Sequence, residues 1–331
     1  MNCRSLAVLF FGAGVTFAGE PPPLTQEEMQ PILRVLQTHY TGGEVLSRAT
    51  ITGLLKDHPD AIQLLTVPDA PPAPAPLLSE LLTPRIACVR PAAFRPEDTA
   101  ALKEALTKLA ASGAGTLVLD LRYPAPDTDP AVVMSLAGLF LPKETPLFTL
   151  TTPLKTSADP VWTRDLLVLI DRETCNAAEI LAAILQSKHR AFILGTRSRG
   201  RTAVINALPV RKVEGGNLVL RYAAQRVSFA DGGDPFGKGV VPDMPVPGGE
   251  GKTGVFAFQA KRGLAAAVFH QPRPRNNEAS LVSRTNPELL ERIALTNGQP
   301  AGYEQQFIDR PLQATVDILV ATHALEPAAG K

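Results

Sequence analysis

Apolar runs and amphipathic segments alternate along the middle of this chain. Short runs rich in Leu, Val and Ile, which are typical of buried strands, occur at 86–90, 116–121, 146–151, 166–170 and 191–194. Between them, the spacing of apolar residues predicts helices over 96–111, 130–140 and 177–186. Strands that alternate with helices predict an α/β fold with a substantially parallel sheet, which we place at residues 85–250.

The sequence before this region predicts a small helical part, residues 19–65. Thr25 and Glu28 form a capping-box pattern that opens a helix through Gln37, and a second helix is expected at 44–55. Residues 66–84 are rich in proline, which neither continues a helix nor joins the interior of a sheet, so an extended linker is expected there. Residues 251–331 form a C-terminal extension that ends in a predicted helix at 311–324.

The first 18 residues have the pattern of a secretory signal peptide. Arg4 is followed by an apolar stretch at 6–17, and Thr16-Phe17-Ala18 has the form of a cleavage site. The apolar stretch is shorter than the roughly 20 residues that span a bilayer, so no integral membrane segment is expected after signal removal. We therefore expect an exported protein that is periplasmic or extracellular.

Composition narrows the choice of partners and cofactors. The formal net charge is +1 and no long run of one sign occurs, which argues against nucleic acid as a partner. The five histidines are scattered without an i, i+4 pair, so neither a metal site nor another cofactor is expected. Beyond the signal peptide, Cys88 and Cys175 permit one disulfide without establishing it.

Two segments carry the strongest functional pattern. In residues 165–180 a strand runs into a tight turn and a helix opens near Asn176; in residues 195–202 a strand ends in a glycine loop that holds Arg201. A Gly-x-Gly-x-x-Pro-Asp motif follows at 237–243. This layout resembles that of the tail-specific, or C-terminal processing, serine peptidases. The resemblance implies a ClpP/crotonase-like α/β core.

The resemblance also implies a serine-lysine site. In that family a serine at the helix start attacks a peptide carbonyl, and a neutral lysine in the glycine loop takes up its proton. Alignment of the two segments with the family places Asn176 at the serine position and Arg201 at the lysine position. An asparagine amide is not a nucleophile at neutral pH, although it is a favourable N-cap and turn residue. A guanidinium can hold a carboxylate but cannot act as a general base.

Other departures from the family pattern surround these two positions. Ile205 stands where many members carry a glutamine that orients the dyad, and Tyr123 begins a proline-containing loop where the family has a glycine-rich one. Prolines have no N–H to offer an oxyanion. The stretch 66–84 is too short for the PDZ domain that many members carry, so that domain is expected to be absent. Glu179 is kept, and we interpret it as a carboxylate in the first turn of the helix.

These substitutions suggest a non-catalytic pseudoprotease of the cell envelope that binds an extended peptide, an unfolded protein segment or an envelope protein partner. The residues expected at its binding site are Tyr123, Cys175, Glu179, Arg199 and Gly200. One alternative is an active serine-type peptidase that carries out C-terminal proteolysis through a displaced nucleophile such as Cys175 or Ser198. Another is a structural subunit of an envelope complex, its old cleft filled by side chains.

Overall fold

The computed structural model describes most of the chain from residue 25 onward. The described residues are 25–39, 53, 55, 61–69, 77–91, 93–122, 129–229, 233–248, 252–268, 282, 286 and 307–325. The signal peptide expected at residues 1–18 lies outside this part, as do Tyr123, most of the helix expected at 44–55 and the prolines of 70–76. The chain divides into two units, Met1–Gly248 and Gly249–Lys331, and each is considered by itself.

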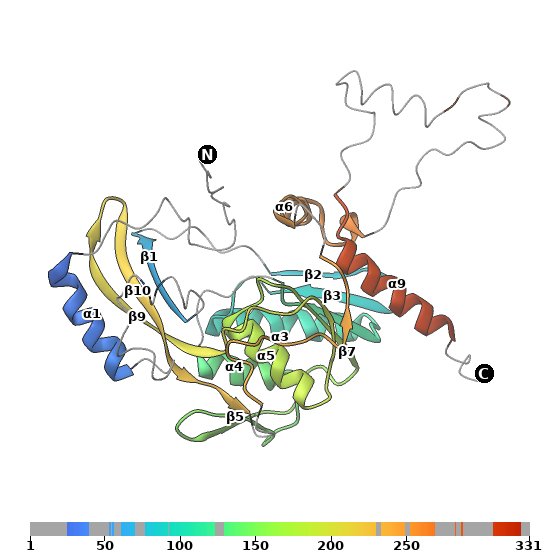
Figure 1. Ribbon diagram of the computed structural model, residues 1–331. Coiled ribbons are helices and arrows are strands. Elements are labelled where there is room, and N and C mark those ends of the chain that lie inside the picture. The colour runs from blue at the N-terminus through green and yellow to red at the C-terminus, as the bar shows by residue number, and fades with distance from the viewer. Residues whose placement is uncertain are drawn as a thin grey trace. The chain divides into compact units, whose positions relative to one another are not determined.

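A six-stranded mixed sheet forms the centre of the first unit (Figure 1). Its strands are β2 (Leu78–Leu81), β3 (Ile86–Arg90), β4 (Thr116–Asp120), β7 (Asp165–Ile170), β8 (Phe192–Gly195) and β12 (Met244–Pro245). They are ordered β12-β8-β7-β4-β3-β2, with parallel pairing from β12 to β3 and an antiparallel β2 at the edge. The predicted α/β fold with a substantially parallel sheet is confirmed.

Three helices cover one face of this sheet: α3 (Pro96–Ala111), α4 (Pro130–Ala137) and α5 (Asn176–Ser187). The chain advances in one direction from β3 through β4 and β7 to β8. Because connections between parallel strands are right-handed, an advance in a constant direction places each connecting helix on the same face. Helix α5 begins soon after β7 ends, at the edge of the sheet formed by the carboxyl ends of the parallel strands.

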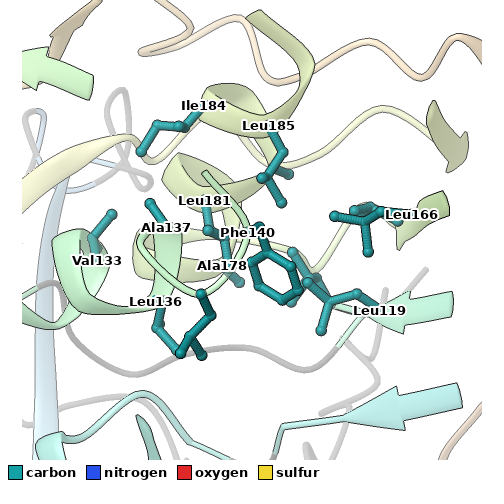
Figure 2. Close-up of a cluster of buried hydrophobic side chains, with 14 of the residues drawn as sticks. Leu119, Val133, Leu136, Ala137, Phe140, Leu166, Ala178, Leu181, Ile184 and Leu185 are labelled. Carbon is teal, nitrogen blue, oxygen red and sulfur yellow. The ribbon is translucent and has the colours of Figure 1, made fainter. Parts of the chain in front are cut away.

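The core between these helices and the sheet is closely packed and apolar. Figure 2 shows Leu136 and Phe140 from the α4 region, Leu181 and Leu185 from α5, and the strand residue Leu119 in one apolar cluster. Ten consecutive residues of α5, from 176 to 185, are buried. A helix that is buried all round belongs to the interior, and its alanines allow close approach of neighbouring elements. α5 is therefore firmly held, which fixes the position of its first turn.

A second sheet is antiparallel and three-stranded, and its strands come from the sequence before and after this core. It consists of β1 (Ile62–Pro68), β10 (Gly216–Arg226) and β9 (Ala203–Val213), in that order. Helix α1 (Gln26–His39) packs Ile32 and Leu36 against it, and lies beside the long β9–β10 hairpin in Figure 1. The predicted capping box is confirmed, because the Thr25 N–H donates to Glu28 Oε2 (2.7 Å) and the Glu28 N–H donates to Thr25 Oγ1 (3.3 Å).

The prediction of an extended linker over 66–84 is wrong at both ends. Residues 62–68 form β1, so the helical part expected at 19–65 also ends in a strand, and residues 78–81 form β2. β1 pairs with β10 in a register that joins Ile62 to Tyr222 and Pro68 to Gly216. Pairing between two strands that are this far apart in the sequence leaves no local sequence signal. The prolines do give a local signal, and that signal suggested a linker.

Two smaller groups of elements complete the description. A three-stranded sheet contains β11 (Ser228–Phe229), β5 (Pro146–Thr149) and β6 (Pro153–Lys155). The second unit contains α6 (Lys252–Arg262), the 3-10 helix η2 (Ala265–Ala267) and α9 (Arg310–Leu325), the last of which was expected at 311–324. Among the residues placed by the structure, no helix is both long and apolar enough to cross a membrane.

Candidate functional site

The turn between β7 and α5 is held by its own side chains. Asp171 Oδ1 accepts the N–H groups of Glu173 (2.9 Å) and Thr174 (3.1 Å). Thr174 Oγ1 then donates to the carbonyl oxygen of Leu121 (3.0 Å), at the end of β4. These bonds join the carboxyl ends of two parallel strands, the edge at which α/β sheets usually bind ligands.

Asn176 is the first residue of α5 and adopts a left-handed backbone conformation, with φ of 53°. Asparagine is among the few residues that tolerate this region. The expected N-cap role is wrong, because Cys175 occupies the N-cap position with an extended backbone. Asn176 is 1% exposed, and its N–H donates to the carbonyl oxygen of Arg201 (3.2 Å). Asn176 and Arg201, the two residues expected from the sequence at the serine and lysine positions, are thus brought into direct contact.

Glu179 joins the first turn of α5 to the glycine loop. Its carboxylate accepts hydrogen bonds from the Ser198 hydroxyl, the Gly200 N–H (2.6 Å) and the Arg201 N–H (2.6 Å). The side chain is fully buried. Burial raises the pKa of Glu179, and the hydrogen bonds from Ser198, Gly200 and Arg201 oppose that rise. Glu179 is therefore more than the first-turn carboxylate that the sequence suggested, since it positions the loop.

The glycine loop packs backbone against backbone on the later glycine motif. Gly200 has φ of 90°, and a Cβ atom there would lie 3.0 Å from the carbonyl carbon of Gly237. The Gly237 N–H donates to the Gly200 carbonyl oxygen (2.7 Å), and the Val240 N–H donates to Ser198 Oγ (2.6 Å). The glycine loop at 195–202 and the glycine motif at 237–243 therefore contact each other directly. The close approach of their backbones at Gly200 requires glycine.

The Arg201 side chain extends toward the second sheet. Its Nη2 donates to Oε1 of Gln63 on β1 (2.8 Å), and the side chain is 7% exposed. Gln63 pairs across the sheet with Arg221 of β10, which is 8% exposed. Ile205, by contrast, packs against the apolar cluster under α1. The structure therefore adds Gln63 and Arg221 to the site and directs Ile205 away from it.

Cys175 is a buried thiol, 4% exposed, and neither Cys88 nor Cys175 forms a disulfide. Burial raises the pKa of Cys175 to about 11, while the nearby charges of Arg201, Arg199 and Arg221 lower it and that of Glu179 raises it. Only the thiolate is nucleophilic, so a raised pKa makes Cys175 a poor nucleophile at neutral pH.

We expect iodoacetamide to label Cys175 of the folded chain at pH 8 at least about a hundredfold more slowly than an ordinary exposed thiol. The reason is that about one thiol in a thousand is ionised at that pH when the pKa is about 11. Labelling is followed by mass spectrometry of the Cys175 peptide, with the chain unfolded in guanidinium as the control. Labelling of the folded chain as fast as the unfolded one would contradict the buried position.

A second charged group, which the sequence did not indicate, lies at the same edge of the sheet. Asp120 is fully buried and accepts hydrogen bonds from Nε of Arg90 (2.8 Å) and from Nε of Arg122 (2.8 Å). The two guanidiniums hold the pKa of Asp120 well below its usual range despite its burial. The sequence signal that could have indicated this ionic group is the presence of charged residues at the ends of apolar strands. Charges buried at such places are nearly always paired with one another.

The structure thus gathers Cys175, Asn176, Glu179, Gly200 and Arg201 at one place. Arg199 joins them, because its N–H donates to the Thr174 carbonyl oxygen (3.0 Å). Within the described ranges, no group of three or more His, Cys, Asp or Glu side chains has the arrangement of a metal site. The fold and these contacts define an α/β protein whose candidate site lies where a parallel strand gives way to a helix.

Comparison with known proteins identifies the family. Residues 85–246 match the model of peptidase family S41, and this α/β part of the chain belongs to that family. Among solved structures, the chain is similar to a photosystem II D1 C-terminal processing protease, with 22% sequence identity and a TM-score of 0.44. That match covers 55% of this chain and 50% of the other, so the chain spans about half the length of that protease.

Two further structures are similar at lower identity. A putative S41 protease from Bacteroides fragilis is 15% identical with a TM-score of 0.45, covering 60% of this chain and 57% of that one. A lipoprotein from Streptococcus agalactiae is 12% identical with a TM-score of 0.44, covering 74% of this chain and 99% of that one. The family assignment rests on the sequence match over residues 85–246.

Proposed function

We propose that this protein is an exported, non-catalytic member of the S41 family that binds an extended peptide or an unfolded protein segment. The observation that carries the proposal is the contact between Asn176 and Arg201 at the start of α5. On the sequence interpretation, these residues stand at the positions of the serine and the lysine. An amide and a guanidinium in these places keep the contact but supply neither a nucleophile nor a general base.

The displaced nucleophiles considered from the sequence have unfavourable surroundings. Cys175 is buried with a raised pKa. Ser198 donates its hydroxyl proton to Glu179 and accepts the Val240 N–H, so its oxygen is engaged in holding the loop. A serine nucleophile needs a base that can take its proton and an approach for substrate. These contacts favour a structural role for Ser198 and support the non-catalytic reading.

The support for peptide binding comes from the strand that follows Arg201. β9 begins two residues later and is an edge strand of the three-stranded sheet as far as the described residues go. The outward N–H and C=O groups of an edge strand can pair with an extended peptide, which then becomes a fourth strand. A peptide bound in this way ends or begins beside the site at α5.

The test is peptide binding without cleavage. We expect fluorescently labelled unfolded peptides to raise their anisotropy on binding the purified chain and to remain full-length by mass spectrometry. Hydrogen exchange of the β9 amides, residues 203–213, should slow when peptide is added, because strand addition pairs the edge. Binding that leaves β9 exchange unchanged would contradict strand addition, and shortened peptides would contradict the non-catalytic assignment.

A second candidate is a structural subunit of an envelope complex. It is favoured by the burial of the site: Asn176, Cys175 and Arg201 are 1%, 4% and 7% exposed. Side chains that fill an old cleft leave little room for a ligand. If no unfolded peptide binds and β9 exchange is unchanged, this second function is the better account.

A further inference from the structure

β9 lies at the end of the three-stranded sheet, with β10 on one side only. Along a β-strand the N–H and C=O groups of successive residues point alternately toward the two sides of the strand. Every second residue of β9 therefore directs its backbone groups away from β10, toward an edge that is open as far as the described residues go. The hydrogen bonds and the register of the sheet determine which residues these are.

One hydrogen bond between β10 and the residue before β1 fixes this alternation. The Ala223 N–H donates to the Ala61 carbonyl oxygen (2.8 Å), so the backbone groups of Ala223 point toward β1. Those of the preceding residue, Tyr222, consequently point toward β9, where Tyr222 pairs with Asn206. The backbone groups of Asn206 face β10 in return. The register is regular over residues 205–209 of β9, so the alternation holds along that stretch.

Three residues of this stretch therefore direct their backbone groups to the open edge: Ile205, Ala207 and Pro209. Ile205 and Ala207 each present an N–H and a C=O group. Pro209 presents only its C=O group, because proline has no N–H. Proline is accepted in a sheet where its nitrogen faces outward at an edge, which agrees with the direction assigned to Pro209. Ala207 and Pro209 are also exposed, so a second chain can approach them.

The later half of β9 is protected against pairing with another chain. The register shifts between Leu218 and Val219 of β10, beside the residue that follows Pro209, which marks a β-bulge. Lys212, farther along β9, is exposed. Prolines, bulges and lysines on an edge strand all hinder the addition of another strand. The edge of β9 is therefore open over residues 203–208 and closed beyond them.

We propose that the open edge, residues 203–208 of β9, docks a short extended peptide segment, and that Pro209 limits the length and fixes the register of that segment. The inference rests on the proposed function and names the residues that select the ligand. Ile205 and Ala207 each donate one hydrogen bond to the added strand and accept one from it. Because backbone groups make these bonds, the ligand is defined by its extended backbone rather than by one side chain.

A second copy of this chain fits the open edge less well than a peptide does. A symmetric antiparallel pair that used Ile205 and Ala207 of both copies would bring Arg211 of one copy close to Arg201 of the other. Like charges that face each other across a pair of strands are unfavourable. The peptide is therefore the occupant that the charges of β9 favour.

The first test replaces Ala207 by proline. This change removes one outward N–H group and no hydrogen bond to β10, so the midpoint of thermal unfolding should stay unchanged. The probe is a fluorescently labelled peptide of about eight residues, rich in Thr and Val. Its affinity, measured by anisotropy, should fall roughly tenfold. Ala207→Val is the matched control, because it keeps the N–H group, and it should retain the affinity of the natural chain.

The second test replaces Pro209 by alanine and expects a gain. The new N–H group lengthens the open edge, so the peptide should bind about twofold to tenfold more tightly. Pro153→Ala is the matched control, because Pro153 is an exposed proline of β6, the edge strand of another sheet. It should leave the affinity unchanged. If Ala207→Pro proves to unfold at a lower temperature, Pro209→Ala decides: a gain supports the proposal and no gain overturns it.

Hydrogen exchange resolved by NMR tests the alternation itself. Added peptide should slow exchange of the Ile205 and Ala207 amides, whereas Asn206 and Leu208 already face β10 and should change little. Equal slowing of all four amides would contradict the assigned directions.

The outcomes separate this inference from the proposed function. If peptides bind but neither Ala207→Pro nor Pro209→Ala alters their affinity, the docking edge is wrong and peptide binding stands. If peptides dock as described and are then cut, the docking edge stands and the non-catalytic assignment fails. If no peptide binds and the chain instead forms a dimer that Ala207→Pro dissociates, a second copy is the occupant, which overturns the proposal. Absence of both peptide binding and dimer formation overturns it as well.

Discussion

Replacing Asp120 by asparagine is expected to lower the free energy of unfolding by about 3–5 kcal/mol. Asp120 is fully buried, and it bonds Arg90 and Arg122 with N–O distances of 2.7 to 2.8 Å. Asparagine keeps the shape but removes the charge, so two buried guanidiniums lose their shared counterion. Removing one member of a buried ionic group is costly because the remaining charges have already given up their hydration.

The effect of Asp120→Asn on stability should depend on pH. The pKa of Asp120 is lower in the folded chain than in the unfolded one, so its contribution is complete above the ordinary carboxyl pKa and is lost as the pH falls below it. The stability difference between the natural chain and Asp120→Asn should therefore be full near pH 7 and should shrink below about pH 4. Urea unfolding at several pH values measures it.

Glu104→Gln is the matched control for Asp120→Asn. It also removes one carboxylate from an ion pair, here with Lys108 at 2.6 Å, but both side chains are largely exposed. Exposed pairs contribute little, so stability should be nearly unchanged. An equal effect of the two substitutions would mean that the burial of the Asp120 group has no energetic consequence, contrary to the structure.

Replacing Glu179 by glutamine is expected to lower the free energy of unfolding by about 2–4 kcal/mol. A glutamine amide has one acceptor oxygen, whereas the Glu179 carboxylate accepts from Ser198, Gly200 and Arg201 with both of its oxygens. At least one buried N–H or O–H group would face the amide nitrogen and lose its acceptor. The loop of residues 198–201 should consequently exchange its amide hydrogens faster.

The controls for Glu179→Gln use Ser198. Ser198→Ala removes one of the three donors and is expected to cost about 1–2 kcal/mol. The double variant should cost less than the sum of the two single variants, because both act on the same hydrogen bonds. Because burial raises the pKa of Glu179, the cost of Glu179→Gln should be greatest below the ordinary carboxyl pKa and decrease as the pH rises. Additive costs would show that Glu179 and Ser198 act independently.

Local patterns in the sequence determined much of the fold. β3 and α3 were predicted with the bounds that they have, because the apolar run at 86–90 and the apolar spacing at 96–111 are complete within each segment. β1 was missed, since its strand character depends on pairing with β10, far along the chain. The prolines that follow β1 gave the only local signal, and they indicated a linker.

The contacts of the candidate site also include some that the sequence could predict and some that it could not. The contact between Asn176 and Arg201 could be predicted, because each lies in a motif with a fixed place relative to a strand end. The bond from Arg201 to Gln63 could not, since 138 positions separate the two residues. Arg221 gave a usable signal, because it is a charged residue inside the largely apolar run 218–224 of β10. Pairing of distant strands decides such contacts, and a single sequence does not record it.

The proposal that this protein, whose residues 85–246 match peptidase family S41, is non-catalytic is tested most directly by turnover of an unfolded protein. The purified natural chain, Cys175→Ala and Ser198→Ala are each incubated at high concentration with a reduced, alkylated protein substrate and with C-terminal peptides, and new termini are sought by mass spectrometry. The expected result is no cleavage above the substrate-only blank for any of the three. Cleavage by the natural chain that disappears in Cys175→Ala or in Ser198→Ala would contradict the proposal and identify the nucleophile.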